Sequence, residues 1–298
     1  MLLKVIQSIT TRVQIKGAAK VLFIIRGLFR NNSSIYECYK RLRLKLDEDV
    51  LYQWWYAINY SSFDVIKLME RYLSPGSTMM DVGANIGFVS LNAARIVGSG
   101  GRVVAVDPQK QVLERLNENI ALNNFTNITV VPCALSAEPG AAVFNAATDA
   151  GLSRLDNLNQ NHYGMNLMEK YQVQKTTLDC LVDAHFDGVA PDVIKIDVEG
   201  HEYQVLKGAA RTLAQKKSVV IMEINQGALR QNDVSLRDIL SFVQPLGYTA
   251  EWIESHSADW LRLSREPTLR EISESSLDES GDIIVFPSCS DSRIAGGI

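Results

Sequence analysis

The sequence lacks an apolar run long enough to cross a bilayer. The longest such stretch near the amino terminus, Val21 to Ile25, ends at Arg26, whereas a transmembrane helix needs about 20 predominantly apolar residues. No small-residue cleavage site follows it, so the pattern of a secretory signal is also missing. We therefore expect a cytoplasmic protein rather than an integral membrane protein.

Cysteine is scarce, and no strong net charge is present. Thirty Lys and Arg residues against 34 Asp and Glu residues leave a net charge of −4, which gives no general attraction to nucleic acid. The cysteines are far apart and show no Cys-x-x-Cys spacing, which argues against disulfides and a cysteine-rich zinc site and fits a reducing compartment. They are Cys38, Cys133, Cys180 and Cys289.

Acidic residues are absent before Glu37, whereas six basic residues occur there. Apolar residues at helical spacing predict an amphipathic helix in this basic segment. We expect this helix to cover the main domain with its basic face in water. The alternative is weak contact of residues 1–30 with an anionic membrane surface, which would make the protein peripheral to a membrane.

A break in the pattern at Ser74-Pro-Gly-Ser77 divides the chain. Residues 35–73 are predicted to be helical, so that a helical extension over residues 1–73 precedes an α/β domain over residues 74–298. With 298 residues, 46% of them hydrophobic, the chain can bury a core without a metal or disulfide. The bulky anchors predicted in the extension are Trp54, Trp55, Tyr56 and Phe63.

After the break, short apolar strands alternate with helical stretches, which is typical of a parallel sheet covered on both faces. A polar insertion over about residues 145–175 interrupts this alternation, and long insertions are commonly functional loops. Helices are predicted up to residue 97, over 112–123 and over 203–213. Strands are predicted over 78–82, 102–106, 128–132, 141–144, 193–198, 219–224, 248–253 and 283–286.

The segment Asp81-Val-Gly83-Ala-Asn85-Ile-Gly87 follows the first of these strands and opens a helix. Gly83 permits a tight turn, and Gly87 lets the helix pack closely on the strand. Asp107 ends the next strand, 20 residues after Gly87, where an acid hydrogen-bonds ribose hydroxyls in doubly wound sheets. The pattern predicts a nucleotide-cofactor site.

The identity of two residues indicates which cofactor is bound. Asn85 stands where a dinucleotide fingerprint has its second glycine, which disfavours NAD. Asp81 would repel phosphates but suits a ligand with a positive charge, such as the ammonium group of S-adenosylmethionine.

A second polar cluster, Asp197-Val-Glu199-Gly200-His201-Glu202, follows a predicted buried strand. Ligands bind beyond the carboxyl ends of such strands, and three ionisable groups so close together favour proton transfer by Asp197, Glu199 and His201. For Glu202 we expect a helix cap instead.

Glu223 lies near the end of the neighbouring strand, so it must be hydrogen-bonded or exposed at the ligand edge. With Asp197, Glu199 and His201 it offers ligands for a divalent cation. The spacing does not require a metal, and we predict an acid–base role without one.

The chain resembles the FkbM family of S-adenosylmethionine-dependent methyltransferases over roughly residues 60–287. The resemblance implies a Rossmann-like sheet of seven strands in the order 3-2-1-4-5-7-6, with an antiparallel last strand at 283–286. It also implies methyl transfer to a hydroxyl of a sugar, polysaccharide or secondary-metabolite acceptor. The matching segments are residues 81–87, 104–108, 131–136, 177–179, 194–202, 205–209 and 221–223.

The resemblance also implies roles for individual residues. Asp81, Gly83, Asn85 and Gly87 would hold the methionine half of the cofactor; Asp107 would take the ribose, and Ala134 and Leu135 would lie near the adenine. His201 is the first candidate for the base, with Asp197 or Glu199 orienting it or replacing it. The acceptor would meet Glu223 and the 145–175 insertion, where Asp149, Ser153 and His162 are the candidate contacts.

Two alternatives remain open at this point. One is a nicotinamide-dependent oxidoreductase or epimerase, which Asn85 argues against. The other is a catalytically silent α/β binding protein, recruited through its basic amino-terminal helix. Binding of S-adenosylmethionine separates both from a methyltransferase, whereas the fold alone does not.

Overall fold

The computed structural model describes residues 35–46, 63–147, 154–155, 167–254 and 266–288. Across these ranges, no helix combines the length and the apolar character that a membrane crossing requires. Cys38, Cys133 and Cys180 are free thiols. Several predicted features lie outside the described residues: the basic helix of residues 1–30, Trp54, Trp55, Tyr56, Asp149, Ser153 and His162.

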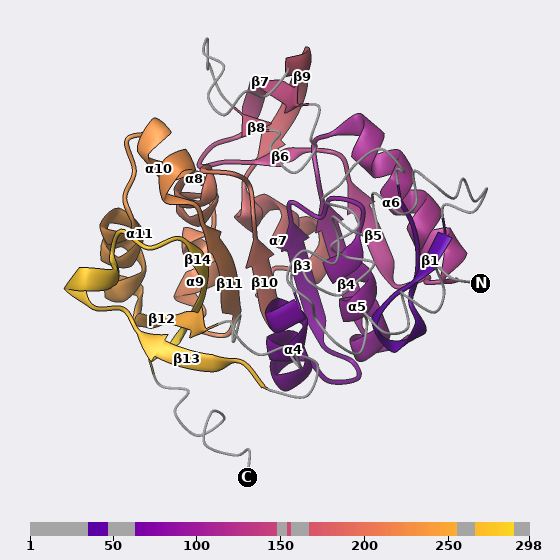
Figure 1. Cartoon of the computed structure of the whole chain (residues 1–298), viewed down its shortest axis with the longest axis horizontal. Coiled ribbons are helices and arrows are strands. Elements are labelled where there is room, and N and C mark those ends of the chain that lie inside the picture. Colours follow the sequence, from indigo (N-terminus) through magenta and orange to yellow (C-terminus); the bar gives the residue numbers. More distant parts are fainter. Residues whose placement is uncertain (1–34, 47–62, 148–153, 156–166, 255–265, 289–298) are drawn as a thin grey trace, which may run out of the picture.

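An eight-stranded sheet forms the centre of the molecule (Figure 1). Its strands, in spatial order, are β5 (Ile128–Val131), β4 (Arg102–Val106), β3 (Thr78–Val82), β10 (Val193–Ile196), β11 (Val219–Ile224), β14 (Gly281–Pro287), β12 (Tyr248–Glu254) and β13 (Thr268–Glu271). Strand β14 is antiparallel to both of its neighbours. The predicted order with its antiparallel last strand is confirmed, and β13 adds an edge strand that the sequence analysis did not predict.

Helices cover both faces of this sheet, as predicted. Successive strand residues face opposite cores, so that Met79 packs with one set of helices and Met80 with the other. On one face lie α4 (Phe63–Tyr72), α5 (Phe88–Val97) and α6 (Lys110–Leu122). On the other lie α7 (Leu178–Phe186), α8 (Glu202–Lys207), α9 (Ala210–Ala214), α10 (Gln226–Gln231) and α11 (Leu236–Val243).

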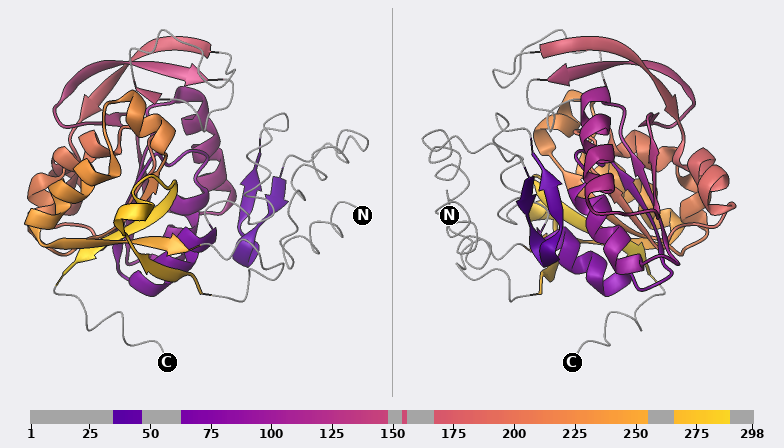
Figure 2. Two further views of the ribbon diagram at one scale, coloured as in Figure 1. Left: turned by 60° about the vertical axis from the view of Figure 1, so that its left-hand side comes forward. Right: turned by 90° about the vertical axis from the view of Figure 1, so that its right-hand side faces the viewer.

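The prediction of helix over residues 35–73 is wrong for its first described part. Strands β1 (Ile35–Glu37) and β2 (Arg43–Lys45) form an antiparallel pair around a short 3₁₀ turn, η1 (Tyr39–Arg41), beside the main body (Figure 2). Helix α4 is helical as predicted, and its Phe63 is a buried anchor.

Contacts that are distant in sequence explain the β1–β2 pair. The Lys45 amide donates to Asn119 Oδ1 on α6 at 2.7 Å, and the Arg43 amide donates to Asn123 Oδ1 at 2.9 Å. Leu44 is fully buried between these two positions. Tertiary hydrogen bonds and burial therefore override the local helical preference of this segment.

A second, four-stranded sheet stands above the carboxyl ends of the parallel strands (Figures 1 and 2). Its strands, in spatial order, are β6 (Ala134–Leu135), β9 (Leu167–Thr176), β7 (Gly140–Ala147) and β8 (Arg154–Leu155). The side chains of Ala134, Phe144 and Val173 form its small core. The 145–175 insertion thus contributes β-structure over the edge where ligands bind in α/β sheets.

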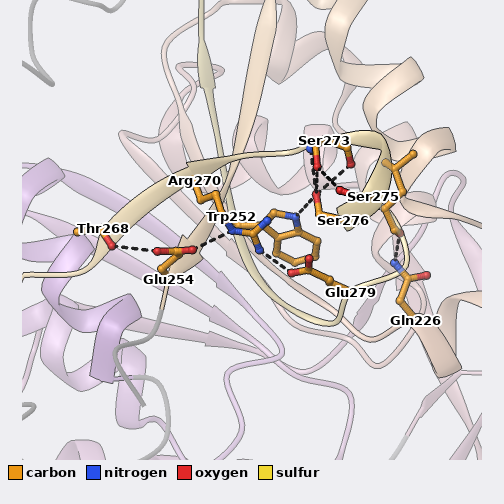
Figure 3. Close-up of polar contacts among 10 residues, drawn as sticks. Gln226, Trp252, Glu254, Thr268, Arg270, Ser273, Ser275, Ser276 and Glu279 are labelled. Carbon is orange, nitrogen blue, oxygen red and sulfur yellow. Dashed lines mark hydrogen bonds and ion pairs between the residues drawn. The ribbon is translucent and has the colours of Figure 1, made fainter. Parts of the chain in front are cut away.

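Polar contacts link the segment after β13, residues 272–280, to the sheet and to α10 (Figure 3). Trp252 Nε1 on β12 donates to the buried Ser276 Oγ at 3.2 Å. Gln226, the first residue of α10, donates through Nε2 to the Leu277 carbonyl at 2.7 Å. This segment therefore supports α10, which borders the site described next. Surface ion pairs of the same network join Arg270, Glu254 and Glu279.

Candidate active site

The two sequence motifs meet through their backbones at the carboxyl ends of β3 and β10. The Asp197 amide donates to the Val82 carbonyl at 3.0 Å. Gly83 has a φ of +78°, and a Cβ there would lie 1.8 Å from the Asp197 carbonyl oxygen. Only glycine fits this contact. The predicted cofactor turn and the predicted catalytic loop are therefore in direct backbone contact.

Gly87 ends the same turn, but its packing partner differs from the prediction. A Cβ at Gly87 would lie 2.4 Å from Leu116 Cδ1 on α6. The glycine therefore permits close approach of α5 to a neighbouring helix, whereas the sequence analysis expected a strand. Sequence spacing alone did not reveal this helix–helix contact.

Asp107 follows β4 and is held by two backbone amides. Its Oδ2 accepts from the Asn85 amide and its Oδ1 from the Gln109 amide, both at 2.9 Å. Burial raises the pKa of Asp107 to about 6, although the two amides act to lower it. Each carboxylate oxygen keeps a further lone pair for an external donor, so this fixed carboxylate fits the ribose hydroxyls of a nucleotide cofactor.

The pKa of Asp107 predicts a pH dependence of cofactor binding. The ionised carboxylate accepts hydrogen bonds, so affinity for S-adenosylmethionine should be full above about pH 6 and fall as the pH drops through that value. Asp107→Asn should bind about tenfold more weakly at neutral pH, since a charge-assisted hydrogen bond is lost, and should lose the pH dependence. Calorimetric titrations across this pH range test both. A wild-type affinity that is constant through pH 6 would contradict the assignment.

Asp81 is fully buried, so its side chain does not face solvent. The Ser90 hydroxyl donates to Oδ2, and Lys195 Nζ lies 3.6 Å from Oδ1. Burial raises the pKa of Asp81, with Lys195 and Ser90 opposing the rise. Within the described residues, Oδ1 accepts no hydrogen bond. Oδ1 is paired with the Lys195 ammonium group and the whole side chain is buried, so the predicted contact between Asp81 and the cofactor stays a prediction.

Lys195 joins the two motifs electrostatically, and the sequence analysis did not single it out. Its Nζ lies 3.1 Å from Asp197 Oδ2 and donates to the Gly83 carbonyl at 3.0 Å. Burial alone would lower the pKa of Lys195, but Asp197 and Asp81 outweigh it and raise the pKa above its usual value. A lysine in the middle of a buried strand was the available signal, since a buried charge needs partners.

Three carboxylates gather at the ends of β10 and β11. Oxygens of Asp197, Glu199 and Glu223 lie within 4.8 Å of one another. Repulsion from Asp197 raises the pKa of Glu223 above its usual value. Burial acts to raise the pKa of Asp197. The Lys195 charge and the hydrogen bond with Glu223 outweigh burial, so the pKa is lowered. The two carboxyl groups therefore titrate as a coupled pair, with Asp197 the stronger acid.

A fourth acid, Asp282, was missed by the sequence analysis. It lies at the start of β14, opposite Glu223 in the strand register, and burial raises its pKa to about 7. An antiparallel strand begins where its parallel neighbours end, which brings Asp282 to the carboxyl edge. Oxygen donors of this kind also suit a hard divalent cation; the acid–base role without a metal stays a prediction.

His201 lies beside the small sheet, and its hydrogen-bond partner was not predicted. Its Nε2 is 3.2 Å from Ser136 Oγ, directly after β6. The side chains of Ala134 and Leu135 are buried, one in the core of the small sheet and the other in the main core. Their placement near adenine stays a prediction.

Tyr171 connects the small sheet to the cofactor side of the site. Its hydroxyl accepts from the Lys110 amide at 3.3 Å, and its ring packs on Phe144 with 5.7 Å between centroids. Lys110 begins α6, three residues after Asp107. The small sheet thus closes over the strand ends next to Asp107, a contact that the polar composition of the insertion did not indicate.

The sheet order and the acidic, glycine-lined edge define a Rossmann-like α/β fold with a candidate nucleotide-cofactor site. The sequence pattern of the Methyltransferase FkbM domain matches residues 81–250, so the chain belongs to the FkbM methyltransferase family. S-adenosylmethionine is the cofactor of this family, which argues against the nicotinamide cofactor left open by the sequence. A pattern for protein-L-isoaspartate (D-aspartate) O-methyltransferases also matches residues 13–134.

Relatives with assigned functions share part of the chain. The hexuronic acid methyltransferase AglP of Haloferax volcanii is 31% identical over 166 residues, covering 55% of this chain and 62% of that protein. An arsenite methyltransferase of Halobacterium salinarum is 36% identical over 56 residues, covering 19% of this chain and 14% of that protein. The matches therefore span less than two thirds of these relatives.

The chain is also similar to a solved FkbM methyltransferase from Methylobacillus flagellatus. The two share 16% identity with a TM-score of 0.44, over 81% of this chain and 56% of the other.

Proposed function

We propose that this methyltransferase O-methylates a hydroxyl of a sugar, polysaccharide or secondary-metabolite acceptor, with assistance from a base. One observation carries the proposal: the Gly83 turn touches the Asp197 carbonyl, so the cofactor turn and the ionisable loop border the same space. The similarity to a hexuronic acid methyltransferase supports a sugar acceptor.

The residues of the edge suit the cofactor in two respects. Asp107 would accept hydrogen bonds from the ribose, and the turn from Gly83 to Gly87 would hold the methionine half next to Asp81. The bound cofactor supplies a methyl group on a positively charged sulfur. The protein then has to hold the acceptor oxygen in line with that methyl group and exclude water.

Of the predicted bases, His201 is the strongest candidate. Asp197 is weakened as a base because the Lys195 charge and the hydrogen bond with Glu223 lower its pKa. A histidine side chain has an unperturbed pKa of about 6.5, close to neutral pH, and the His201 ring is hydrogen-bonded to Ser136. We propose that His201 accepts the hydroxyl proton as the methyl group is transferred, and that Glu199 and Glu223 bind acceptor hydroxyls.

A panel of related acceptors tests the proposal. The protein is incubated with S-adenosylmethionine and either p-nitrophenyl β-D-glucuronide, its methyl ester or p-nitrophenyl β-D-glucoside, and products are identified by mass spectrometry. Methylation of the ester or the glucoside supports a hydroxyl acceptor. Methylation of the free acid alone would move the acceptor atom to the carboxylate, for which no base is needed, and methylation of none would contradict a sugar acceptor of this type.

The role of His201 is tested with the acceptor that reacts. His201→Ala should lower kcat by about 10²–10⁴-fold, the usual contribution of a positioned base, and should leave the Kd for S-adenosylmethionine unchanged. An unchanged kcat would remove His201 from the mechanism.

A further inference from the structure

We infer that Glu202 is a positioning residue, which holds the loop of residues 197–201 in the shape that directs the proposed catalytic groups into the site. This inference rests on the proposed function for its catalytic consequence, but its geometric part stands on the structure alone. Glu202 was expected to cap the following helix α8, and its carboxylate does interact with its own amide in the first turn of that helix. The same side chain also binds the loop that precedes the helix.

The contacts of Glu202 explain how the loop is held. Strand β10 ends at Ile196, and the Asp197 amide that follows still donates to the Val82 carbonyl. The Val198 and Gly200 amides beyond it bind a side chain instead of a strand. Glu202 Oε1 accepts from the Val198 amide at 3.2 Å and from the Gly200 amide at 3.0 Å. The Glu202 side chain is 1% exposed, so water cannot replace it in these bonds.

The loop needs these two hydrogen bonds because its backbone is strained. Glu199 has a φ of +52°, a left-handed conformation that residues with a Cβ rarely adopt. Strained backbone persists only where surrounding contacts fix it. Here Glu202 fixes the amides on either side of Glu199. Without it, Glu199 is free to return to an unstrained conformation, which redirects the carboxylate and shifts Asp197 and His201.

Helix α10 holds the same loop from the other side. A Cβ at Gly200 would lie 2.6 Å from the Ala228 carbonyl oxygen, so the loop lies directly against this helix. Asn232 Nδ2 donates to the Gly200 carbonyl at 3.1 Å, and Asn225 Nδ2 donates to Glu199 Oε2 at 3.4 Å. In both contacts an asparagine side chain donates to an oxygen of the loop, so neither contact satisfies a loop amide. Among the contacts described for the loop, the amides of Val198 and Gly200 are bound by Glu202.

Glutamine is a suitable conservative replacement at this position. Burial raises the pKa of Glu202 to about 7, against the effect of the bonded amides, so the native carboxyl is protonated in part of the molecules at neutral pH. Within the described residues, Oε2 has no hydrogen-bond partner. A glutamine keeps the accepting oxygen and the volume of the side chain, so it should keep the loop in place.

Asp179 provides a matched control elsewhere in the fold. Its Oδ1 accepts from the Thr212 amide at 2.8 Å, and its Oδ2 accepts from the Arg211 amide at 3.0 Å. It thereby joins α7 to α9 by the same chemistry that Glu202 uses, two backbone amides bound by one carboxylate. None of the proposed site residues takes part in this contact.

The experiment compares Glu202→Ala, Glu202→Gln and Asp179→Ala in the full chain. Amide hydrogen exchange is measured at residues 198–201 and 211–212, together with the Kd for S-adenosylmethionine and the turnover of the p-nitrophenyl sugar that reacts best. Glu202→Ala should raise exchange at Val198 and Gly200 about tenfold or more, and lower kcat about 100-fold. Glu202→Gln should stay within about threefold of the wild type in both.

The control separates positioning from a general loss of stability. Asp179→Ala should raise exchange at residues 211–212 and leave kcat within about threefold of the wild type. Equal kcat losses in Glu202→Ala and Asp179→Ala, or a loss in Glu202→Gln as large as in Glu202→Ala, would overturn the inference. A wild type that methylates no acceptor would count against the proposed function alone, since the exchange at Val198 and Gly200 still decides whether Glu202 holds the loop.

Discussion

Gly83→Ala is expected to reduce the affinity for S-adenosylmethionine by about 100-fold or more, because two costs add. A Cβ at this position would lie 1.8 Å from the Asp197 carbonyl oxygen, at a φ of +78°. Left-handed backbone costs a residue with a Cβ about 1–2 kcal/mol, and overpacking adds about 1–3 kcal/mol. Since the clash is with backbone, the cofactor turn and the Asp197 loop must move apart, and every 1.4 kcal/mol or so is a factor of ten in affinity.

Gly76→Ala is the matched control for this change. Gly76 also has a positive φ, +90°, but no atom lies within 4 Å of the position of its Cβ. It carries the conformational cost without the clash, so calorimetry should find a cofactor affinity close to that of the wild type. If Gly83→Ala binds S-adenosylmethionine as tightly as Gly76→Ala does, the turn is not part of the cofactor site.

Lys195→Met is expected to destabilise the protein by about 3–5 kcal/mol, because removing one partner of a buried ion pair leaves the other charges uncompensated. Lys195 lies between Asp81, which is fully buried, and Asp197, which is partly buried. Methionine preserves most of the volume, so the loss measured by urea unfolding reports mainly on charge. Asp81→Asn in the same chain removes one of the uncompensated carboxylates and should recover part of the loss.

The pH dependence of Lys195→Met follows from the same charges. Without the ammonium group, burial and mutual repulsion raise the pKa values of Asp81 and Asp197 in the folded state above those in the unfolded chain. An acid with a raised folded-state pKa costs stability when it is ionised, so the deficit should be largest near neutral pH and shrink as the pH falls toward about 4. A deficit that is constant over this range would mean that lost packing, rather than charge, explains it.

Much of the central sheet could be predicted because its signals are local. The apolar strands from Thr78 to Val82 and from Val219 to Ile224 are found within the predicted limits. The glycine turn, Asp107 and the polar loop after Ile196 lie at the same edge because parallel strands all end there. The contact between Gly83 and Asp197 depends on sheet order, which the family resemblance supplied.

The remaining features depend on contacts between distant parts of the chain. The β1–β2 pair is held by Asn119 and Asn123, which follow it by more than 70 residues. Ser136 becomes the partner of His201 only after the small sheet is formed. Asp282 reaches the site because β14 runs opposite to its neighbours. Lys195 is the exception, since its place in an apolar strand was visible in the sequence.

The most direct test of the account is a calorimetric titration of the purified protein with S-adenosylmethionine and, separately, with NAD. Each titration is repeated with Asp107→Ala. Saturable binding of S-adenosylmethionine that this substitution weakens, together with the absence of NAD binding, is the expected result. Failure of the wild type to bind S-adenosylmethionine, or binding that is equally tight after the substitution, would contradict a cofactor site at the carboxyl ends of β3 and β4.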